Sequence, residues 1–326
     1  MYDIIIDGGT TNLRVFLLSI EGEIICSEKA EGGVKYTAID GNNSRLRSML
    51  KNCIESVLQR TNTQITEIRR CVAFGMITSG LGLLEIPHIA APASAADLRN
   101  GMKNAGFDEI LPIEIEFIPG VRNFNGEINV ANVSQMDMMR GEETETIGLL
   151  SLLKPSGAAV LILPGSHNKL ISISADGKIL GCKTSISGEL LDAVTHHTIL
   201  SGAVEGSFCN SEEYDSSYAL AGAKEAVSNG LGRAAFAGRI LSVTGGCPAG
   251  KVRSWLLGAT LAQDVQTLNG FTAGNKETEI YIAGIDPVKT ALFDILSKEG
   301  YNNITAVPEE ISSQMGSAGA RLIAGL

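Results

Sequence analysis

Hydrophobic and polar residues follow a strand-like pattern at the start of the chain. Residues 4–6 form an apolar run, and after the loop DGGTTN hydrophobic side chains alternate with polar ones over residues 13–17. A turn at Glu21-Gly22 leads into a third short run at residues 24–26. Alternation with a period of two is typical of half-buried strands, and short turns containing glycine are typical of hairpins. We therefore predict a β-meander that opens a sheet.

The rest of the first half changes between helical and strand patterns. Residues 42–60 place hydrophobic side chains at helical spacing after three candidate capping residues, Asn42, Asn43 and Ser44. The short apolar runs CVAFGM and IEIEFIPG are separated by a helical pattern at residues 94–104. This alternation of strands and helices predicts an α/β domain.

The second half of the chain repeats the pattern of the opening segment. The sequence AAVLILPGSHNKLISISADGKILGCKTS again predicts strand, glycine loop, strand, turn and strand. Gly9-Thr10 aligns with Gly165-Ser166 and Arg14 with Lys169, at a spacing of about 156 residues (165 − 9). So long a period predicts a duplicated domain rather than a solenoid. The alternative is the general likeness of any two meanders with glycine turns.

The remainder of the second half is mainly helical. Residues 211–270 show Ala-rich helical faces, and the segment TEIYIAGI predicts a buried strand followed by a helix at 286–298. The segment NNITAVP predicts another strand, and residues 309–325 a final helix. The segment GGCPAGKV is similar to a phosphate-binding P-loop but has Val252 where that loop needs Ser or Thr. We interpret it as a turn that begins a helix.

Composition and charge narrow the classes of function. The chain has 326 residues, 44% hydrophobic and 19% charged, which is enough for two globular domains and excludes disorder as its main state. Its net charge of −10 argues against nucleic acid or an anionic membrane as a partner. Six cysteines without a CxxC pair favour a reducing compartment over a disulfide framework or a zinc site. The sequence shows no signal peptide and no apolar run of about 20 residues, so we expect a cytoplasmic protein.

Each half carries a glycine loop between two predicted strands. The first loop contains Thr10 and Thr11, the second contains Ser166, and a basic residue follows each loop. Backbone N–H groups in such loops can bind phosphate oxygens together with a cation, so the two loops could hold one polyphosphate. Asp7, at the end of the first strand, could hold Mg²⁺ through water. An ordinary turn is the alternative for DGGTTN taken alone.

The segment MRGEET, at residues 139–144, predicts the start of a helix. It places Glu142 and Glu143 in the first turn, where the helix dipole favours acidic residues, so capping alone could explain both. Glu142 also precedes Gly165 by 23 residues (165 − 142), which leaves room for one helix and one strand before the second glycine loop. This spacing makes Glu142 a candidate for catalysis.

The order DGGTTNLR, RGEET, LPGSHNK resembles the superfamily of sugar kinases, actin and heat-shock-chaperone ATPases. More narrowly, MRGEET, PGSHNK and SGELL are similar to the MRGEET, PGTHxK and TGEL segments of the 2-dehydro-3-deoxygalactonokinase family. The resemblance extends from residue 3 to about residue 201 and weakens beyond. It implies an α/β fold of two ribonuclease-H-like, actin-like ATPase domains, residues 1–145 and 146–326, each with a five-stranded mixed sheet flanked by helices, and a cleft between them.

The resemblance also implies roles for individual residues. The first phosphate loop would comprise Asp7, Gly9, Thr10, Thr11 and Asn12, and the second Gly165, Ser166, His167 and Lys169. ATP would lie between the loops with Gly284 on its adenosine side, and Asp7 would hold Mg²⁺. Glu142 would be the catalytic base, and Lys169 would stabilise charge on the transferred phosphoryl group. The predicted contacts to the sugar acid are Arg140, Thr78, Ser79 and Glu189.

The implied activity is ATP-dependent phosphorylation of the terminal C6 hydroxyl of 2-dehydro-3-deoxy-D-galactonate, in sugar-acid catabolism. Relatives usually carry tryptophan where this chain has Gly8 and Leu170, which leaves the identity of the sugar acid open. The alternatives are a kinase for another sugar acid, ketose or polyol, and a non-catalytic, nucleotide-switched binding protein. We expect no nucleic-acid or membrane partner, and we allow for a homodimer.

Overall fold

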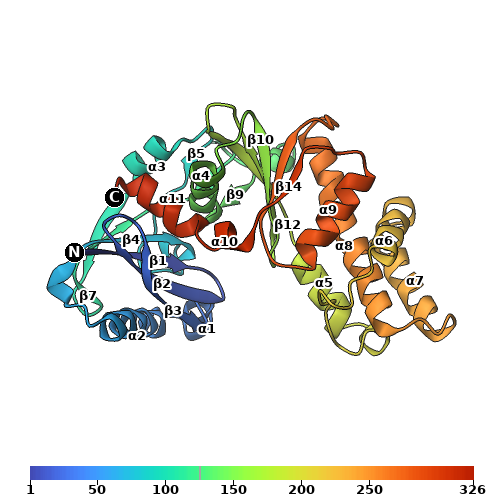
Figure 1. The fold of residues 1–326 in the computed structure, drawn as a ribbon, viewed down its shortest axis with the longest axis horizontal. Helices are drawn as coiled ribbons and strands as arrows, with labels where there is room; N and C mark the ends of the chain where they lie inside the picture. Colours follow the sequence, from blue (N-terminus) through green and yellow to red (C-terminus); the bar gives the residue numbers. More distant parts are fainter. Residues whose placement is uncertain (125) are drawn as a thin grey trace. The chain divides into compact units, whose positions relative to one another are not determined.

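The structure, a computed structural model, describes residues 1–124 and 126–326. Contacts between Cα atoms divide the chain, whose course is shown in Figure 1, into two compact units. Unit 1 comprises residues 1–156, 174–182 and 313–326, and unit 2 comprises residues 157–173 and 183–312. Neither unit is one continuous segment. The predicted boundary after residue 145 falls within α4 (Glu142–Leu153), a helix of unit 1.

Unit 1 is built on a six-stranded mixed sheet with the strand order β3-β2-β1-β4-β7-β6. The predicted meander is confirmed, because β1 pairs antiparallel with β2, and β2 with β3. β1 also pairs parallel with β4, and β4 parallel with β7. The strands are β1 (Tyr2–Gly8), β2 (Asn12–Ser19), β3 (Ile24–Glu31), β4 (Ile68–Gly75), β6 (Lys103–Phe107) and β7 (Leu111–Phe117).

The expectation of five strands in this sheet is wrong, because the predicted helix at 94–104 is shorter than its pattern suggests. Helix α3 (Ala95–Gly101) ends at Gly101, and the next residues form the edge strand β6, which pairs antiparallel with β7. The side chains of β6 are exposed or half-buried, so the strand has no hydrophobic alternation. Its pairing partner, not its own pattern, determines its conformation.

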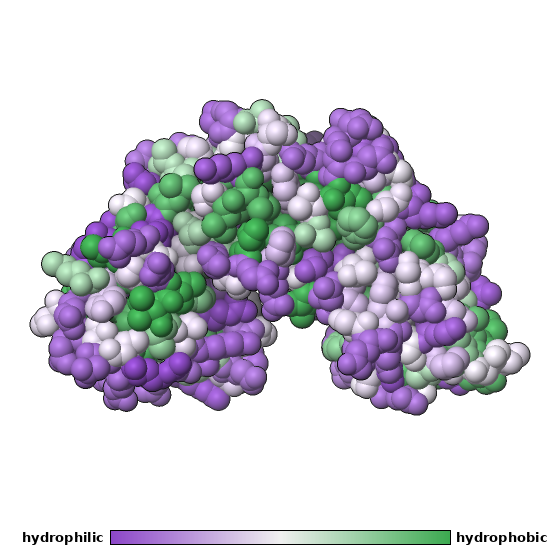
Figure 2. Space-filling view, in the orientation of Figure 1, coloured by the Kyte–Doolittle hydropathy of each residue, from purple (hydrophilic) through white to green (hydrophobic). Residues whose placement is uncertain are grey.

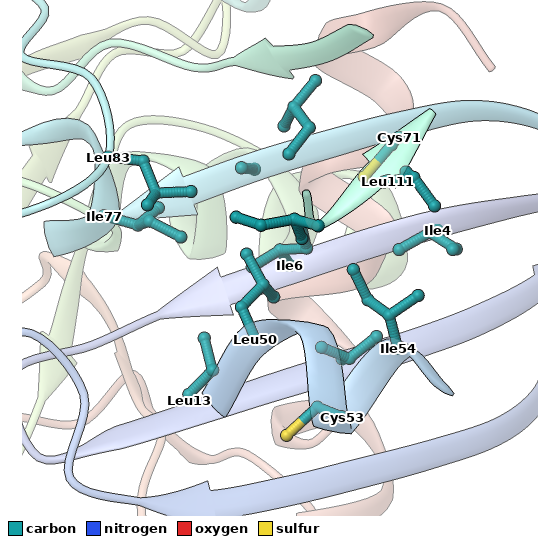
Figure 3. Packing of buried hydrophobic residues seen from close by; sticks show 14 of the residues in the cluster. Ile4, Ile6, Leu13, Leu50, Cys53, Ile54, Cys71, Ile77, Leu83 and Leu111 are labelled. Atoms are coloured by element: carbon teal, nitrogen blue, oxygen red, sulfur yellow. The ribbon is translucent and has the colours of Figure 1, made fainter. Parts of the chain in front are cut away.

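Two groups of helices pack on opposite faces of this sheet. Helix α2 (Ser44–Thr61) covers one face, and Figure 3 shows its Leu50 and Ile54 beside Ile4 and Ile6 of β1 in one buried cluster. Strand alternation points Phe74 of β4 to the other face, which α4 and α11 (Met315–Ala324) contact. The remaining elements are α1 (Lys35–Asp40), η1 (Ile65–Glu67), η2 (Met76–Thr78), η3 (Val133–Gln135) and a small sheet of β5 (Ile89–Ala90), β8 (Val121–Arg122) and β9 (Met138–Met139).

Helix α11 brings the end of the chain back to unit 1. It packs so closely on α4 that a Cβ at Gly148 would lie 1.8 Å from the Met315 carbonyl oxygen, and one at Gly319 would lie 1.9 Å from that of Thr144. The prediction of a single helix over residues 309–325 is wrong, because the structure has two helices there. The chain forms α10 (Glu309–Ser312) in unit 2, passes between the units after residue 312, and begins α11 at Met315.

Unit 2 repeats the sheet topology of unit 1. Its five strands have the order β12-β11-β10-β13-β14, with β10 antiparallel to β11 and parallel to β13, and β13 parallel to β14. This order matches β3-β2-β1-β4-β7, so the predicted duplication is confirmed. The strands are β10 (Ala159–Leu163), β11 (Asn168–Ile173), β12 (Ile179–Ser185), β13 (Glu279–Ile282) and β14 (Ile304–Ala306).

Helices dominate the second half of unit 2, as the sequence predicts. They are α5 (Ser187–His196), η4 (Ser201–Ala203), α6 (Ser216–Asn229), α7 (Leu231–Val243), α8 (Ala249–Phe271) and α9 (Val288–Lys298). The segment GGCPAGKV contains the turn that begins α8 at Ala249, as predicted. No helix within residues 1–124 or 126–326 combines the length and hydrophobicity needed to cross a bilayer. On the face shown in Figure 2, hydrophobic residues lie in separate groups among hydrophilic ones.

Candidate active site

The first glycine loop, residues 8–12, is a tight turn whose carbonyl groups are bonded within unit 1. The Gly9 N–H donates to the Asn12 carbonyl at 2.9 Å. The carbonyl oxygens of residues 9, 10 and 11 accept from N–H groups of the segment 32–35, at 3.1, 3.0 and 2.7 Å. Thr10 and Thr11 are exposed, and their own N–H groups have no hydrogen-bond partner in the part of the chain that the structure describes. Two unsatisfied donors therefore face solvent, as an anion site requires.

Gly33 allows this close approach. It has a φ of +32°, and a Cβ at this position would lie 2.1 Å from the Gly9 carbonyl oxygen. Any other residue would push the segment 32–35 away from the loop and release the carbonyl groups. The sequence analysis did not identify Gly33, because nothing in the local sequence shows that the segment 32–35 contacts the first glycine loop.

Asp7 and Glu142 lie at neighbouring ends of secondary-structure elements in unit 1. Asp7, the residue before the last one of β1, lies opposite Arg14 of β2, and the Arg14 guanidinium is 3.3 Å from the Asp7 carboxylate. Gly141 precedes α4 with a φ of +117°, and a Cβ there would lie 3.3 Å from the Cα of Gly75, which pairs with Gly8 in the sheet. Burial raises the pKa of Asp7, Arg14 lowers it, and the negative charge of Glu142 raises it again.

The two adjacent glutamates at the start of α4 have different surroundings. Glu143 is fully buried, and both of its carboxylate oxygens accept the Gly141 N–H, at 2.9 and 2.8 Å. Burial, with the neighbouring charge of Glu142, raises the pKa of Glu143 to about 7. Glu142 is half-buried and accepts the Arg140 N–H at 3.0 Å through Oε2. Capping thus explains Glu143, while Glu142 remains accessible for chemistry.

Glu145 is a third carboxylate of this group, which the sequence analysis did not identify. It follows Glu142 by three residues on α4, a spacing that places both side chains on the same side of the helix. Burial raises the pKa of Glu145 to about 8, and the charges of Asp7 and Glu142 contribute to the shift. Among the described residues, no three His, Cys, Asp or Glu side chains are placed to hold a metal ion together.

Replacing Glu145 by glutamine is expected to stabilise the protein at high pH. A carboxyl whose pKa rises from 4.5 when unfolded to about 8 when folded stabilises the fold below pH 4.5, and this contribution is lost as pH rises towards 8. Glu145→Gln removes the titration, so its Tm should exceed that of the wild type by about 2–4 °C at pH 9 and approach it near pH 5. Thermal melts from pH 5 to 9 test this, with Glu55→Gln on the exposed face of α2 as control. A difference independent of pH would contradict it.

The predicted sugar-binding residues of unit 1 have protein partners. One guanidinium nitrogen of Arg140 donates to the carbonyl and the hydroxyl of Thr78, both at 2.6 Å, and the other bonds to the Ile86 carbonyl at 2.9 Å and to His88 Nδ1 at 3.2 Å. The Ser79 hydroxyl donates to the Met76 carbonyl at 2.6 Å. Arg140 therefore ties the segment 76–88 to the start of α4, and its contact with a substrate stays a prediction.

The second glycine loop, residues 164–168 of unit 2, is similar to the first, but a side chain closes it. The Gly165 N–H donates to Asn168 Oδ1 at 2.9 Å, and the Ser166 carbonyl accepts the Glu189 N–H at 3.2 Å. A Cβ at Gly188 would lie 2.1 Å from the Gly165 carbonyl oxygen, as at Gly33 in unit 1. Ser166 and His167 are exposed, and their N–H groups have no hydrogen-bond partner within residues 1–124 and 126–326.

Two charged side chains flank the second loop. Lys169 is 6% exposed and donates through Nζ to the Thr184 hydroxyl at 2.6 Å. Glu189, predicted to contact the substrate, lies in unit 2 with its Oε1 3.0 Å from His167 Nε2. The structure therefore places Glu189 beside the second glycine loop, in a different unit from Thr78, Ser79 and Arg140.

A cavity of about 540 Å³ in unit 2 adjoins the second loop. Its walls combine Gly165 and Ser166 of the loop with Glu189 and Asp192 of α5 and with apolar side chains that include Phe208, Leu257, Ile285 and Val288. Gly284, with a φ of +148°, packs against Pro164 and leads into Ile285. A cavity of this size with an apolar interior and a few polar groups suits a small organic ligand, and the adjacent N–H groups suit its anionic part.

A model of the 2-keto-3-deoxy-galactonokinase family matches residues 7–315. The chain belongs to this family. A curated relative from Rhizobium meliloti, "Probable 2-dehydro-3-deoxygalactonokinase DgoK1", is 25% identical over 326 residues, which cover 98% of this chain and 96% of that protein. A crystal structure from Sinorhizobium meliloti, of a protein described by the same enzyme name, matches with a TM-score of 0.77 at 22% identity over 98% of each chain.

A more distant structural match supports the fold assignment. The activator of 2-hydroxyisocaproyl-CoA dehydratase from Clostridium difficile, solved with bound ADPNP, has a TM-score of 0.51 at 14% identity, and the match covers 99% of this chain and 94% of that chain. The predicted α/β fold of the actin-like ATPase and sugar-kinase type is confirmed.

Gly8 and Leu170, the two positions where the sequence analysis expects tryptophan in relatives, are both closely packed in this member of the 2-keto-3-deoxy-galactonokinase family. A Cβ at Gly8 would lie 2.5 Å from the Cβ of Ile77, so the space of a side chain is already occupied. Leu170 is 2% exposed and belongs to the buried hydrophobic cluster of unit 2. Both replacements therefore fit the packing of this chain.

Proposed function

We propose that this chain is an ATP-dependent kinase that phosphorylates the C6 hydroxyl of 2-dehydro-3-deoxy-D-galactonate and releases the 6-phosphate and ADP. The observation that supports this most directly is the pair of glycine loops, one in each unit, each with two exposed N–H groups that have no hydrogen-bond partner among the described residues. Membership of the 2-keto-3-deoxy-galactonokinase family indicates the reaction and the substrate class.

In the proposed reaction, Glu142 orients the substrate hydroxyl and accepts its proton as the oxygen attacks the γ-phosphorus in line. The N–H groups of Thr10, Thr11, Ser166 and His167, together with Lys169, bind the phosphate oxygens and stabilise their charge. Because phosphoryl transfer has a loose transition state, positioning and electrostatic stabilisation supply most of the rate, and the proton transfers late. Glu142 is suited to this role because one of its oxygens is held by the Arg140 N–H while the side chain remains half-exposed.

Mg²⁺ belongs to the proposal as the ion that would neutralise phosphate charge. Asp7 supplies the hard oxygen ligand that Mg²⁺ prefers, and its contact through water fits the finding that no three candidate ligands converge in the described part of the chain. The nearby Glu142 and Glu145 would add negative potential at the same end of the sheet. A cytoplasmic location is also part of the proposal, which allows for a homodimer.

A substrate panel tests the proposed function. ADP release by the purified protein should depend on 2-dehydro-3-deoxy-D-galactonate and be much slower with other sugar acids, ketoses and polyols. Preference for one of these instead would assign the kinase to a different substrate. Hydrolysis of ATP that no sugar stimulates would contradict the kinase assignment and favour a nucleotide-switched binding protein.

A further inference from the structure

Asp264, on α8, is a buried carboxylate outside the chemistry described above. It is 2% exposed. Its Oδ2 accepts from Asn168 Nδ2 at 2.8 Å, and its Oδ1 accepts the hydroxyl of Ser185. Burial raises the pKa of this carboxyl, and the hydrogen bonds from Ser185, Asn168 and Ser187 lower it. Burying a carboxylate in a hydrophobic core lowers the stability of the fold unless such donors bond to it. We therefore ask what these hydrogen bonds position in unit 2.

One consequence of Asp264 is the orientation of the Asn168 amide. Asn168 is also 2% exposed, and its Oδ1 accepts the Gly165 N–H at 2.9 Å. A carboxylate accepts hydrogen bonds but does not donate them, whereas an amide has one accepting oxygen and one donating nitrogen. Because Asp264 accepts from Nδ2, Oδ1 must face the loop and close it at Gly165. The N–H groups of Ser166 and His167 then lie outside the closed turn.

The same carboxylate also holds the start of α5. Ser185, which donates to Asp264, bonds to the hydroxyl of Ser187 at 2.9 Å, and Ser187 is the first residue of α5. The next residue, Gly188, packs directly on the Gly165 carbonyl. Gly165, Asn168, Ser187 and Gly188 line one cavity of about 230 Å³, whereas Asp264 is not among its lining residues.

We propose that Asp264 is a positioning residue that fixes the second glycine loop and the first turn of α5 relative to each other, so that the N–H groups of Ser166 and His167 bind the phosphates of one nucleotide. Asp264 holds the loop through Asn168 and the start of α5 through Ser185. It touches no reacting atom. This inference rests on the proposed function, because the ligand it serves is the nucleotide of the kinase.

The test is binding of ADP in the presence of Mg²⁺, measured by calorimetry on the full chain. Asp264→Leu should weaken ADP binding about tenfold, the order expected when a buried hydrogen-bonding group loses its partner. Asp264→Asn should restore most of the affinity, because an amide at 264 can accept from Asn168 and donate to Ser185. The KM for ATP should rise in Asp264→Leu while the KM for the sugar acid stays unchanged, a separation that general loss of stability would not produce.

Asn168→Ala provides a second variant that leaves the carboxylate in place. It should weaken ADP binding, and the double variant should lose no more than Asp264→Leu alone, because Asn168 lies on one of the two routes through which that carboxylate acts. Thr267→Val, which removes a hydroxyl of α8 that donates to the Gln263 carbonyl of the same helix, is the control. Folded variants that bind ADP like the wild type, or losses that add, would overturn the inference. A wild type that binds no ADP would instead overturn the proposed function.

Discussion

Glu142→Gln is expected to lower kcat by about two to four orders of magnitude, the range that a general base contributes, while the affinity for ATP changes little. Glutamine keeps the volume of the side chain and can still accept the Arg140 N–H that holds Glu142 Oε2 at 3.0 Å. It cannot accept the proton of the substrate hydroxyl. The loss should therefore appear in kcat and not in nucleotide binding, measured by steady-state ADP release and by calorimetry with ADP.

A control variant makes this prediction specific to Glu142. Glu55→Gln, on the exposed face of α2, makes the same chemical change in unit 1 and should leave kcat within twofold of the wild type. If Glu142→Gln turns over at the wild-type rate, another group accepts the proton and the assignment of the base is wrong.

The sequence predicts most of the fold because its strongest signals are local. The alternating runs and glycine loops near residues 9 and 165 predict both meanders, and the shared strand order of the two sheets follows from that repeat. The elements that the sequence misplaces depend on distant partners. Strand β6 exists through its pairing with β7, and the break between α10 and α11 occurs where the chain passes from unit 2 to unit 1.

The candidate site is predictable in part, for the same reason. The motif MRGEET identifies two adjacent glutamates, but only the structure shows that Glu143 caps the helix at Gly141 while Glu142 stays accessible. Arg140 looks like a substrate cation in the sequence, yet its guanidinium bonds to Thr78, Ile86 and His88. Helical spacing from Glu142 could have indicated Glu145, whereas Asp264 lies 96 residues from Asn168 in the chain, and no local pattern connects them.

Lys169→Met is expected to lower kcat by about two to three orders of magnitude, as when a donor that stabilises transition-state charge is removed. Lys169 lies opposite Leu163 of β10, just as Arg14 lies opposite Asp7 in unit 1. The cation beside the second loop therefore faces an apolar residue, whereas Arg14 faces a carboxylate. Its ammonium is held by the Thr184 hydroxyl at the end of a nearly buried side chain. Methionine fills a similar volume without the charge. Steady-state kinetics with ATP and the sugar acid measures the loss.

A second substitution distinguishes the contribution of the positive charge to kcat from that of the geometry of the side chain. Lys169→Arg keeps the positive charge but replaces a compact ammonium with a planar guanidinium, so it should recover only part of the activity lost in Lys169→Met. Thr184→Val removes the hydroxyl that holds the ammonium and should reduce kcat less than Lys169→Met, because the charge remains. Melting temperatures within a few degrees of the wild type would show that the fold persists. Wild-type turnover by a folded Lys169→Met protein would mean that the phosphoryl charge is met elsewhere, by the loop N–H groups and the metal alone.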